Sequence, residues 1–177
     1  MRIDKMIRHF LLTIMAALAA LTVSAQSDRI SIEDFVLDRD STISVSVMLI
    51  NETPVRGLQF SITMPEGIEI TEHSLTKSSK KYGMNLVFRQ VDNDDYAVFI
   101  YPMDHVCYPS DSVAILTLEL TAAADFKGGE IILSGVRGST IDNKSFSLDG
   151  DTATVTVPAS SLIGIPVDQT QDKKKFF

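Results

Sequence analysis

The stretch Gly57–Ile68 reads Gly-Leu-Gln-Phe-Ser-Ile-Thr-Met-Pro-Glu-Gly-Ile. Over its first seven residues, apolar and polar side chains occupy alternate positions: Leu58, Phe60 and Ile62 against Gln59, Ser61 and Thr63. A period of two residues is typical of a β-strand with one face in a core and the other in solvent. The stretch therefore predicts a half-buried strand with Phe60 in the core.

The same alternation recurs along most of the chain. It is clearest over residues 43–49, 97–101, 114–120 and 152–157, and shorter apolar runs lie at 29–37, 68–75, 86–91 and 130–134. Beyond residue 25, no window of a dozen residues keeps the apolar spacing of an amphipathic helix. We therefore predict an all-β fold of about nine short strands, arranged as a jelly-roll β-sandwich.

Clusters of Asp, Asn, Ser, Gly and Pro separate these runs, as expected of turns between strands. Asp149-Gly150 is a dipeptide typical of two-residue turns and predicts a β-hairpin at that point. Within 114–120, the alternation places Leu116 on the core face and Ile115 on the opposite face with Thr117.

The first 25 residues have the pattern of a secretory signal peptide. Met1–His9 is basic, the next fourteen residues are uncharged, and Val23-Ser24-Ala25 offers small residues for cleavage. The alternative is a membrane anchor, but fourteen helical residues span about 21 Å, less than the ~30 Å of a bilayer core. We expect an exported protein that is secreted, periplasmic or at the cell surface, with no membrane span after cleavage.

Charge and cysteine content exclude several classes of function. The chain carries 16 Lys and Arg against 23 Asp and Glu, a net charge of −7, which argues against nucleic acid as the main partner. A single cysteine allows no intramolecular disulfide. With 45% hydrophobic and 22% charged residues, the composition is that of one globular domain, which we place at residues 26–158.

Several stretches resemble the cohesin-like domains of secreted Bacteroidetes proteins. They are Ile30–Phe35, the Gly-Leu-Gln-Phe segment through Pro65-Glu66-Gly67, Tyr96–Tyr101 and Val113–Leu120, and the match covers Arg29–Val157. Cohesins are similar in fold to a group of carbohydrate-binding modules. The resemblance implies a nine-stranded jelly roll and a binding rather than a catalytic role, with no cofactor.

The end of the chain has a second resemblance. After Pro158 the alternation stops, and we expect residues 159–177 to form a flexible tail. Ile163–Asp168 and the Lys-rich residues that follow are similar to the start of the C-terminal sorting domain of some Bacteroidetes secreted proteins. The chain stops before the strands of such a domain, so we interpret the tail as a truncated sorting segment or a chance likeness.

Two clusters contain residue types that carry chemistry. Asp104-His105-Val106-Cys107 places a potential nucleophile near a base, but a Cys–His pair needs direct contact and a third orienting group. We favour a loop with a structural cysteine, because Cys usually behaves as a small buried hydrophobe. Asp92–Asp95 has oxygen ligands suited to calcium, yet a solvated hairpin turn is the simpler interpretation. We predict no catalytic residue and no metal site.

The candidate binding residues lie on the outer faces of the predicted strands. If Val98 and Ile100 fill the core, Phe99 and Tyr101 face outward, unless the Tyr108–Asp111 loop covers them. In cohesins the corresponding strands belong to a flat sheet that binds the partner. The predicted partner-binding residues are Phe99, Tyr101, Gln59, Ser61, Thr63 and Arg89.

These features together predict a secreted, non-catalytic, cohesin-like module. It would dock a protein partner, dockerin-like in kind, within a surface or polysaccharide-degrading assembly. One alternative is a carbohydrate-binding module that binds a glycan directly. Another is an adhesion or surface-assembly subunit whose edge strands pair with a neighbour.

The exported protein is expected to begin at Gln26, because the small-residue cleavage site ends at Ala25. N-terminal sequencing or the intact mass of the exported protein checks this. Retention of Met1–Ala25 in that protein would contradict the assignment.

Overall fold

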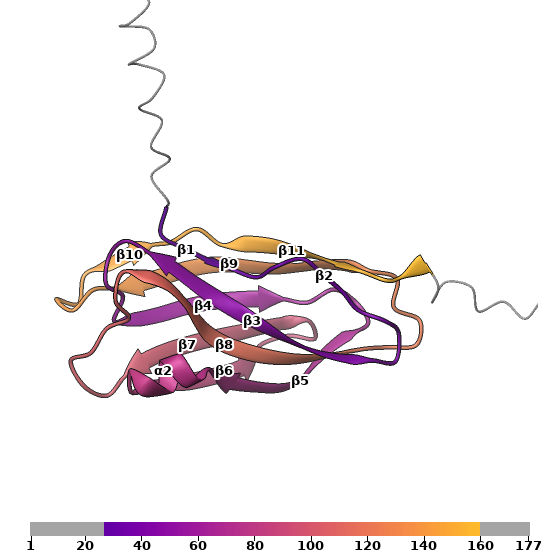
Figure 1. Ribbon diagram of the computed structural model, residues 1–177, viewed down its shortest axis with the longest axis horizontal. Helices are drawn as coiled ribbons and strands as arrows, with labels where there is room; N and C mark the ends of the chain where they lie inside the picture. Colours follow the sequence, from indigo (N-terminus) through magenta and orange to yellow (C-terminus); the bar gives the residue numbers. More distant parts are fainter. Residues whose placement is uncertain (1–26, 160–177) are drawn as a thin grey trace, which may run out of the picture.

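A computed structural model describes residues 27–159, and the predicted leader and most of the tail lie outside them (Figure 1). Within this range no helix has the length and hydropathy needed to cross a bilayer. The described chain forms one short helix and eleven strands: β1 (Arg29–Ser31), β2 (Phe35–Val36), β3 (Thr42–Asn51), β4 (Gly57–Thr63), β5 (Ile68–Leu75), α2 (Lys77–Lys81), β6 (Met84–Gln90), β7 (Asp95–Pro102), β8 (Asp111–Ala122), β9 (Gly129–Ser139), β10 (Ser145–Ser147) and β11 (Asp151–Thr156).

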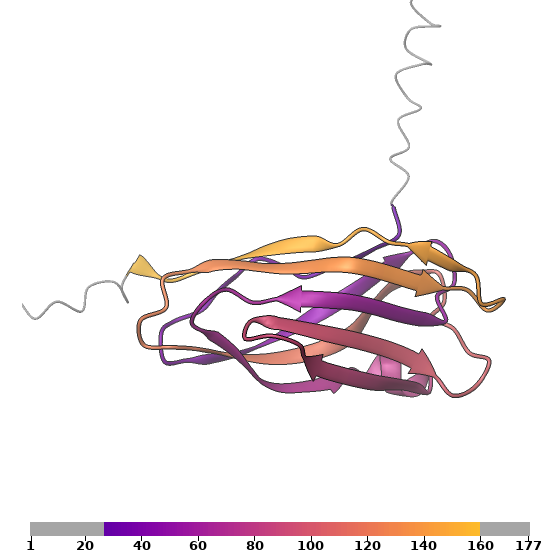
Figure 2. The same ribbon diagram turned by 180° about the vertical axis from the view of Figure 1, so that it is seen from behind.

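The strands form two sheets that stack face to face (Figure 1). One has four strands in the order β1–β3–β8–β5, and the other has seven, in the order β2–β11–β9–β4–β7–β6 with β10 paired to β9. Figure 2 shows the seven-stranded sheet from its outer side. The predicted all-β sandwich is confirmed. The run at 29–37 gives two strands rather than one, because β1 pairs with β3 while β2 crosses over to pair with β11.

The core lies between the sheets and confirms the predicted faces of β4 and β7. Phe60 is 1% exposed, and Val98 and Ile100 on the neighbouring β7 are 0% and 1% exposed. The largest fully buried side chains are Tyr108, Phe60, Phe126, Ile30, Leu49, Ile62, Ile100, Ile115, Leu116, Leu118, Leu120 and Ile131. They come from strands of both sheets and from the loops at Tyr108 and Phe126.

The Pro-Glu-Gly segment takes the chain from one sheet to the other. After β4 ends, the Ile68 N–H donates to the Pro65 carbonyl at 3.3 Å, which closes a four-residue turn. Gly67 is the third residue of this turn and has a φ of 87°, a conformation that glycine adopts without strain. The chain then enters β5 on the edge of the four-stranded sheet.

A β-bulge in β8 overturns the outward placement of Ile115. Val47 of β3 pairs with Leu116, but the next residue, Met48, pairs with Ala114, so Ile115 is an extra residue. The bulge turns both Ile115 and Leu116 inward, and each is 0% exposed. The Ile115 carbonyl is satisfied by the Ser79 hydroxyl of α2 at 2.8 Å.

The predicted hairpin at Asp149-Gly150 is wrong. β10 and β11 do not pair with each other, because both pair antiparallel with β9. The chain reverses instead at Thr140–Lys144, where the Thr140 N–H donates to the Lys144 carbonyl at 3.0 Å. β9 carries its own bulge at Gly135, whose φ is 62°, opposite Phe60 of β4.

Phe60→Ala is expected to destabilise the fold by about 3–5 kcal/mol, because it leaves a cavity in the middle of the core. Urea or thermal unfolding measures the loss. Gln59→Ala, one residue away on the outer face, serves as the matched control and should unfold close to wild type. Equal unfolding of the Phe60→Ala variant and wild type would contradict the placement of β4.

Candidate functional site

The outer face of the seven-stranded sheet brings together side chains from β6, β7, β4 and β9. Phe99 pairs with Val87 on one side and with Gln59 on the other. Gln59 pairs in turn with Arg137. Because residues in register on neighbouring strands point to the same side of a sheet, these four side chains form one row across the outer face.

An exposed apolar patch lies at one end of this row. Val87, Phe99 and Tyr101 are 45%, 39% and 43% exposed, and we call these three residues the aromatic patch. Met103, which follows β7, is also exposed. Three large apolar side chains side by side on a soluble domain are typical of an interaction surface.

A shallow groove of about 360 Å³ runs beside the aromatic patch. Gly57 pairs with Ser139 of β9 and carries no side chain, so this part of the sheet is hollowed between Tyr101 and β9. Six of the lining residues are Gly57, Gln59, Phe99, Tyr101, Arg137 and Ser139. The groove offers aromatic ring surface on one side and hydrogen-bond donors on the other.

The six predicted binding residues share this face. Gln59 and Ser61 are exposed on β4, and Arg89 is exposed on β6 opposite Ala97. Thr63 is half-buried at the far end of β4, and its hydroxyl donates to Asp95 Oδ1 at 2.5 Å. Thr63 lies four residues beyond Gln59, about 13 Å along the strand, so it is the most distant from the aromatic patch.

Val87 and Arg137 belong to the same face but are not among the residues that the sequence pattern predicts there. Val87 sits in the run at 86–91, where polar and apolar residues do not alternate clearly. Arg137 follows the bulge at Gly135, which changes the register of β9 relative to β4. Val136-Arg137-Gly138, with Val136 taken as inward, is the short signal that could have placed Arg137 outward.

The loop after β7 does not cover the aromatic patch, because its tyrosine is anchored in the core. Tyr108 is 0% exposed and its hydroxyl donates to the Ser79 hydroxyl at 2.6 Å. Burial raises the pKa of Tyr108 to about 12, with the Ser79 hydrogen bond opposing the rise. Val55 and Tyr108 also exchange backbone hydrogen bonds, which hold the loop at the end of the sandwich.

The outer face of the four-stranded sheet has a different chemistry. Three of its strands, β3, β5 and β8, contain no Lys or Arg, and its cation is Arg29 on the edge strand β1, which pairs with Ile50. Glu72 of β5 pairs with Glu119 of β8, and Glu69 pairs with Thr121. The β5–β8 part of this face is acidic and rich in hydroxyl groups, and none of the exposed large apolar side chains of residues 27–159 belongs to β3, β5 or β8.

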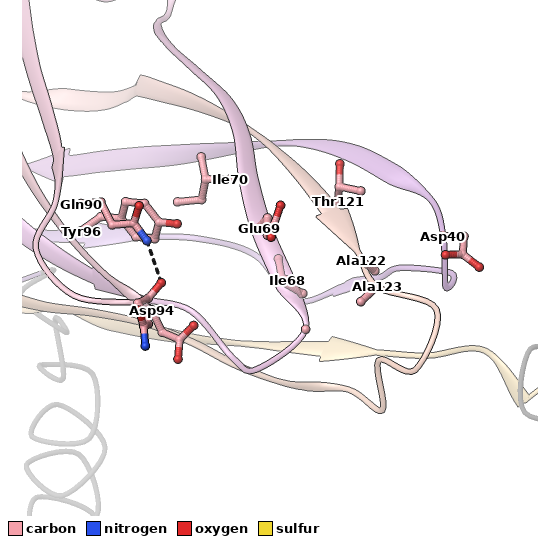
Figure 3. A pocket seen from close by; sticks show the side chains of 12 residues that line it. Asp40, Ile68, Glu69, Ile70, Gln90, Asp94, Tyr96, Thr121, Ala122 and Ala123 are labelled. Atoms are coloured by element: carbon pink, nitrogen blue, oxygen red, sulfur yellow. Dashed lines mark hydrogen bonds between the residues drawn. The ribbon is translucent and has the colours of Figure 1, made fainter.

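A pocket of about 670 Å³ lies where β5 meets the β6–β7 turn (Figure 3). Asp40, Glu69 and Asp94 line it, together with Tyr96. Burial, and then the carboxylates of Glu69 and Asp94, raise the pKa of Tyr96. These carboxylates disfavour an anionic ligand.

The Asp92–Asp95 segment forms the turn between β6 and β7. The Val91 N–H donates to the Asp95 carbonyl at 2.8 Å, and the Gln90 amide donates to the Asn93 carbonyl at 2.8 Å. Within residues 27–159, no three His, Cys, Asp or Glu side chains are grouped so as to hold a metal ion.

Asp104–Cys107 lies in the loop between β7 and β8. His105 is exposed and Cys107 is half-buried, and no hydrogen bond joins the two in the described part of the chain. Burial raises the pKa of the Cys107 thiol, and the nearby Arg56 charge only partly opposes the rise. An activated nucleophile needs the opposite shift, so this environment does not favour thiolate chemistry.

No protein-family model matches the sequence, and no curated protein matches it. Solved structures of cohesins do match. The sixth cohesin of scaffoldin B from Acetivibrio cellulolyticus, solved in complex with a dockerin, has a TM-score of 0.64 and 14% identity; the match covers 75% of this chain and 100% of that one.

Two further solved structures of cohesins match the chain, one from a glycoside hydrolase and one from an archaeon. The cohesin module of a family 33 glycoside hydrolase from Clostridium perfringens has a TM-score of 0.61 and 9% identity, over 75% of this chain and 98% of that one. A non-cellulosomal cohesin from the archaeon Archaeoglobus fulgidus has a TM-score of 0.59 and 17% identity, over 75% and 93%. At these identities the likeness shows the fold, which is cohesin-like; a Bacteroidetes origin stays a prediction.

Cys107→Ser is expected to lower the free energy of unfolding by no more than about 1–2 kcal/mol, because the thiol is half-buried and forms no bridge. Binding of any partner should be nearly unchanged. Thermal unfolding and a binding titration measure both quantities. Complete loss of an activity that other variants of the same loop retain would identify a nucleophile and contradict this interpretation.

Proposed function

We propose that the exported chain is a non-catalytic docking module, and that the outer face of its seven-stranded sheet binds a protein partner. The aromatic patch is the observation that carries the proposal. It exposes three large apolar side chains on regular strands, where the pairing of β6, β7 and β4 holds them in place. Aromatic side chains dominate the binding energy of protein interfaces.

The cohesin-like fold supports a dockerin-like partner. Several of the similar structures are cohesins in complex with dockerins, including two from Clostridium thermocellum. By the resemblance, the strands that correspond to β9, β4, β7 and β6 form the partner-binding sheet of cohesins. The predicted signal peptide supports an assembly outside the cytoplasm, at a surface or in a polysaccharide-degrading complex.

A protein partner fits this face better than a glycan does. Glycan-binding surfaces of the sandwich type favour a line of exposed aromatic rings, and the chain has no Trp. Of its four tyrosines, Tyr101 is exposed while Tyr82, Tyr96 and Tyr108 are half-buried or buried. Phe99 and Tyr101 make a pair of rings rather than a line.

Phe99→Ala combined with Tyr101→Ala is expected to abolish capture of the partner from the native secretome. Truncating a central interface aromatic costs about 2 kcal/mol or more, roughly a thirty-fold loss of affinity for each such residue. Titration of the captured and purified protein against both chains measures the loss. Circular dichroism should show an unchanged fold, because both rings point away from the core.

Val36→Ala combined with Ile141→Ala is the matched control, since these exposed side chains lie outside the aromatic patch. The control chain should bind like wild type. If the Phe99 and Tyr101 variant binds equally well, the proposed face is wrong. If a glycan array is bound and no protein is captured, the partner class is wrong.

A further inference from the structure

The outer face of the seven-stranded sheet carries two exposed arginines, and the strand register places both of them close to the aromatic patch. Arg137 lies in the same row as Phe99, and Arg89 pairs with Ala97, midway between Phe99 and Asp95. The chain as a whole carries a net charge of −7, and β5 and β8 of the four-stranded sheet are acidic on their outer face. Two exposed arginines around the aromatic patch are therefore a local feature that the overall composition does not explain.

The two arginines flank the aromatic patch on opposite sides. Arg137 is separated from Phe99 by one strand, so their Cα atoms are about 10 Å apart. Arg89 pairs with Ala97, two residues before Phe99, about 7 Å along the strand. The aromatic patch and Gln59 thus lie between two guanidinium groups.

Neither arginine is engaged within the described chain. Arg89 and Arg137 are exposed, and neither guanidinium group makes a hydrogen bond or ion pair with another residue of 27–159. Arg56, by comparison, donates to Asn143 Oδ1 at 2.6 Å. Arginines that stay free beside exposed aromatic rings are positioned to meet an incoming carboxylate through both arms of the guanidinium.

The groove adds hydroxyl donors beside Arg137. Ser139 and Ser145 line it, and neither side chain hydroxyl has a hydrogen-bond partner in the described part of the chain. The absence of a side chain at Gly57 leaves the Ser139 hydroxyl open, since a Cβ there would lie 3.1 Å from it. A short acidic side chain would find a guanidinium, two hydroxyls and the edge of Tyr101 in one place.

We infer that the partner presents an acidic segment to this face, with apolar side chains on the aromatic patch and carboxylates paired to Arg137 and Arg89. The inference rests on the proposed function, because it names the chemistry of the partner that the same face binds. Glu69, Glu72 and Glu119 on the outer face of β5 and β8 repel such a segment, which disfavours its binding to that part of the four-stranded sheet.

Salt dependence is a poor test of this inference. Salt weakens the local arginine–carboxylate pairs, but it also screens the repulsion between two acidic molecules, and the two effects have opposite signs. Charge reversal at single residues separates them, because it changes the local pairs and leaves the remaining charges in place.

A display library of helical peptides, each with randomised exposed positions, serves as the probe. Selection on the chain beginning at Gln26 should enrich peptides with an excess of Asp and Glu around an apolar ridge. Selection on the chain carrying Arg89→Glu and Arg137→Glu should lose these peptides and enrich basic ones. Lys127→Glu with Lys144→Glu makes the same charge change at exposed turn positions outside the aromatic patch, and should enrich the acidic set.

A synthetic copy of one enriched peptide then gives affinities. Arg137→Glu should weaken its binding by about tenfold or more, and exchanging the peptide's contacting carboxylate for Lys should restore part of the loss. Peptides that need Phe99 and Tyr101 but show no acidic excess would overturn the inference while leaving the docking face intact. Enrichment that survives Phe99→Ala with Tyr101→Ala, or no enrichment at all, would overturn the docking face and the inference with it.

Discussion

The pairing of β4 with β7 is the constraint on which the rest of the molecule depends. Phe60 pairs with Val98, and both are buried between the sheets. Because side chains alternate across a strand, burying this pair forces Gln59 and Phe99 outward together. A one-residue slip would exchange the two sets, and it would bury Gln59 at the cost of Phe60. The same contact that holds the core therefore presents the candidate binding face.

Regular strands were predictable from the sequence, because a half-buried strand shows its two faces as alternating residue types. β3, β4 and β7 follow this pattern, and their faces were predicted correctly. Two other predictions were wrong, one because of a β-bulge and one because of the strand pairing. Ile115 is an additional residue in β8, and its side chain turns inward. No residue type near it predicts the β-bulge. Asp149-Gly150 has the composition of a hairpin turn, but the strands on both sides pair with β9, which sequence order alone does not reveal.

The candidate site was predictable to the same extent. Phe99, Tyr101, Gln59, Ser61, Thr63 and Arg89 do lie on one face, since each belongs to a strand whose alternation or neighbours set its direction. Arg137 depends on a register shift in β9, and Val87 on an edge strand with weak alternation. The groove at Gly57 depends on which strand lies beside it, so it became visible only in the folded chain. The role of this face in binding remains a proposal.

The central claim is that one outer face, and not the other or the loops, meets the partner. Backbone amide chemical-shift mapping of the ¹⁵N-labelled chain, with the captured partner added, tests it most directly. The account predicts that the largest shifts cluster on β6, β7, β4 and β9, around Val87, Phe99, Gln59 and Arg137. Shifts that cluster instead on β3, β5 and β8, or in the Asp92–Asp95 turn, would contradict it.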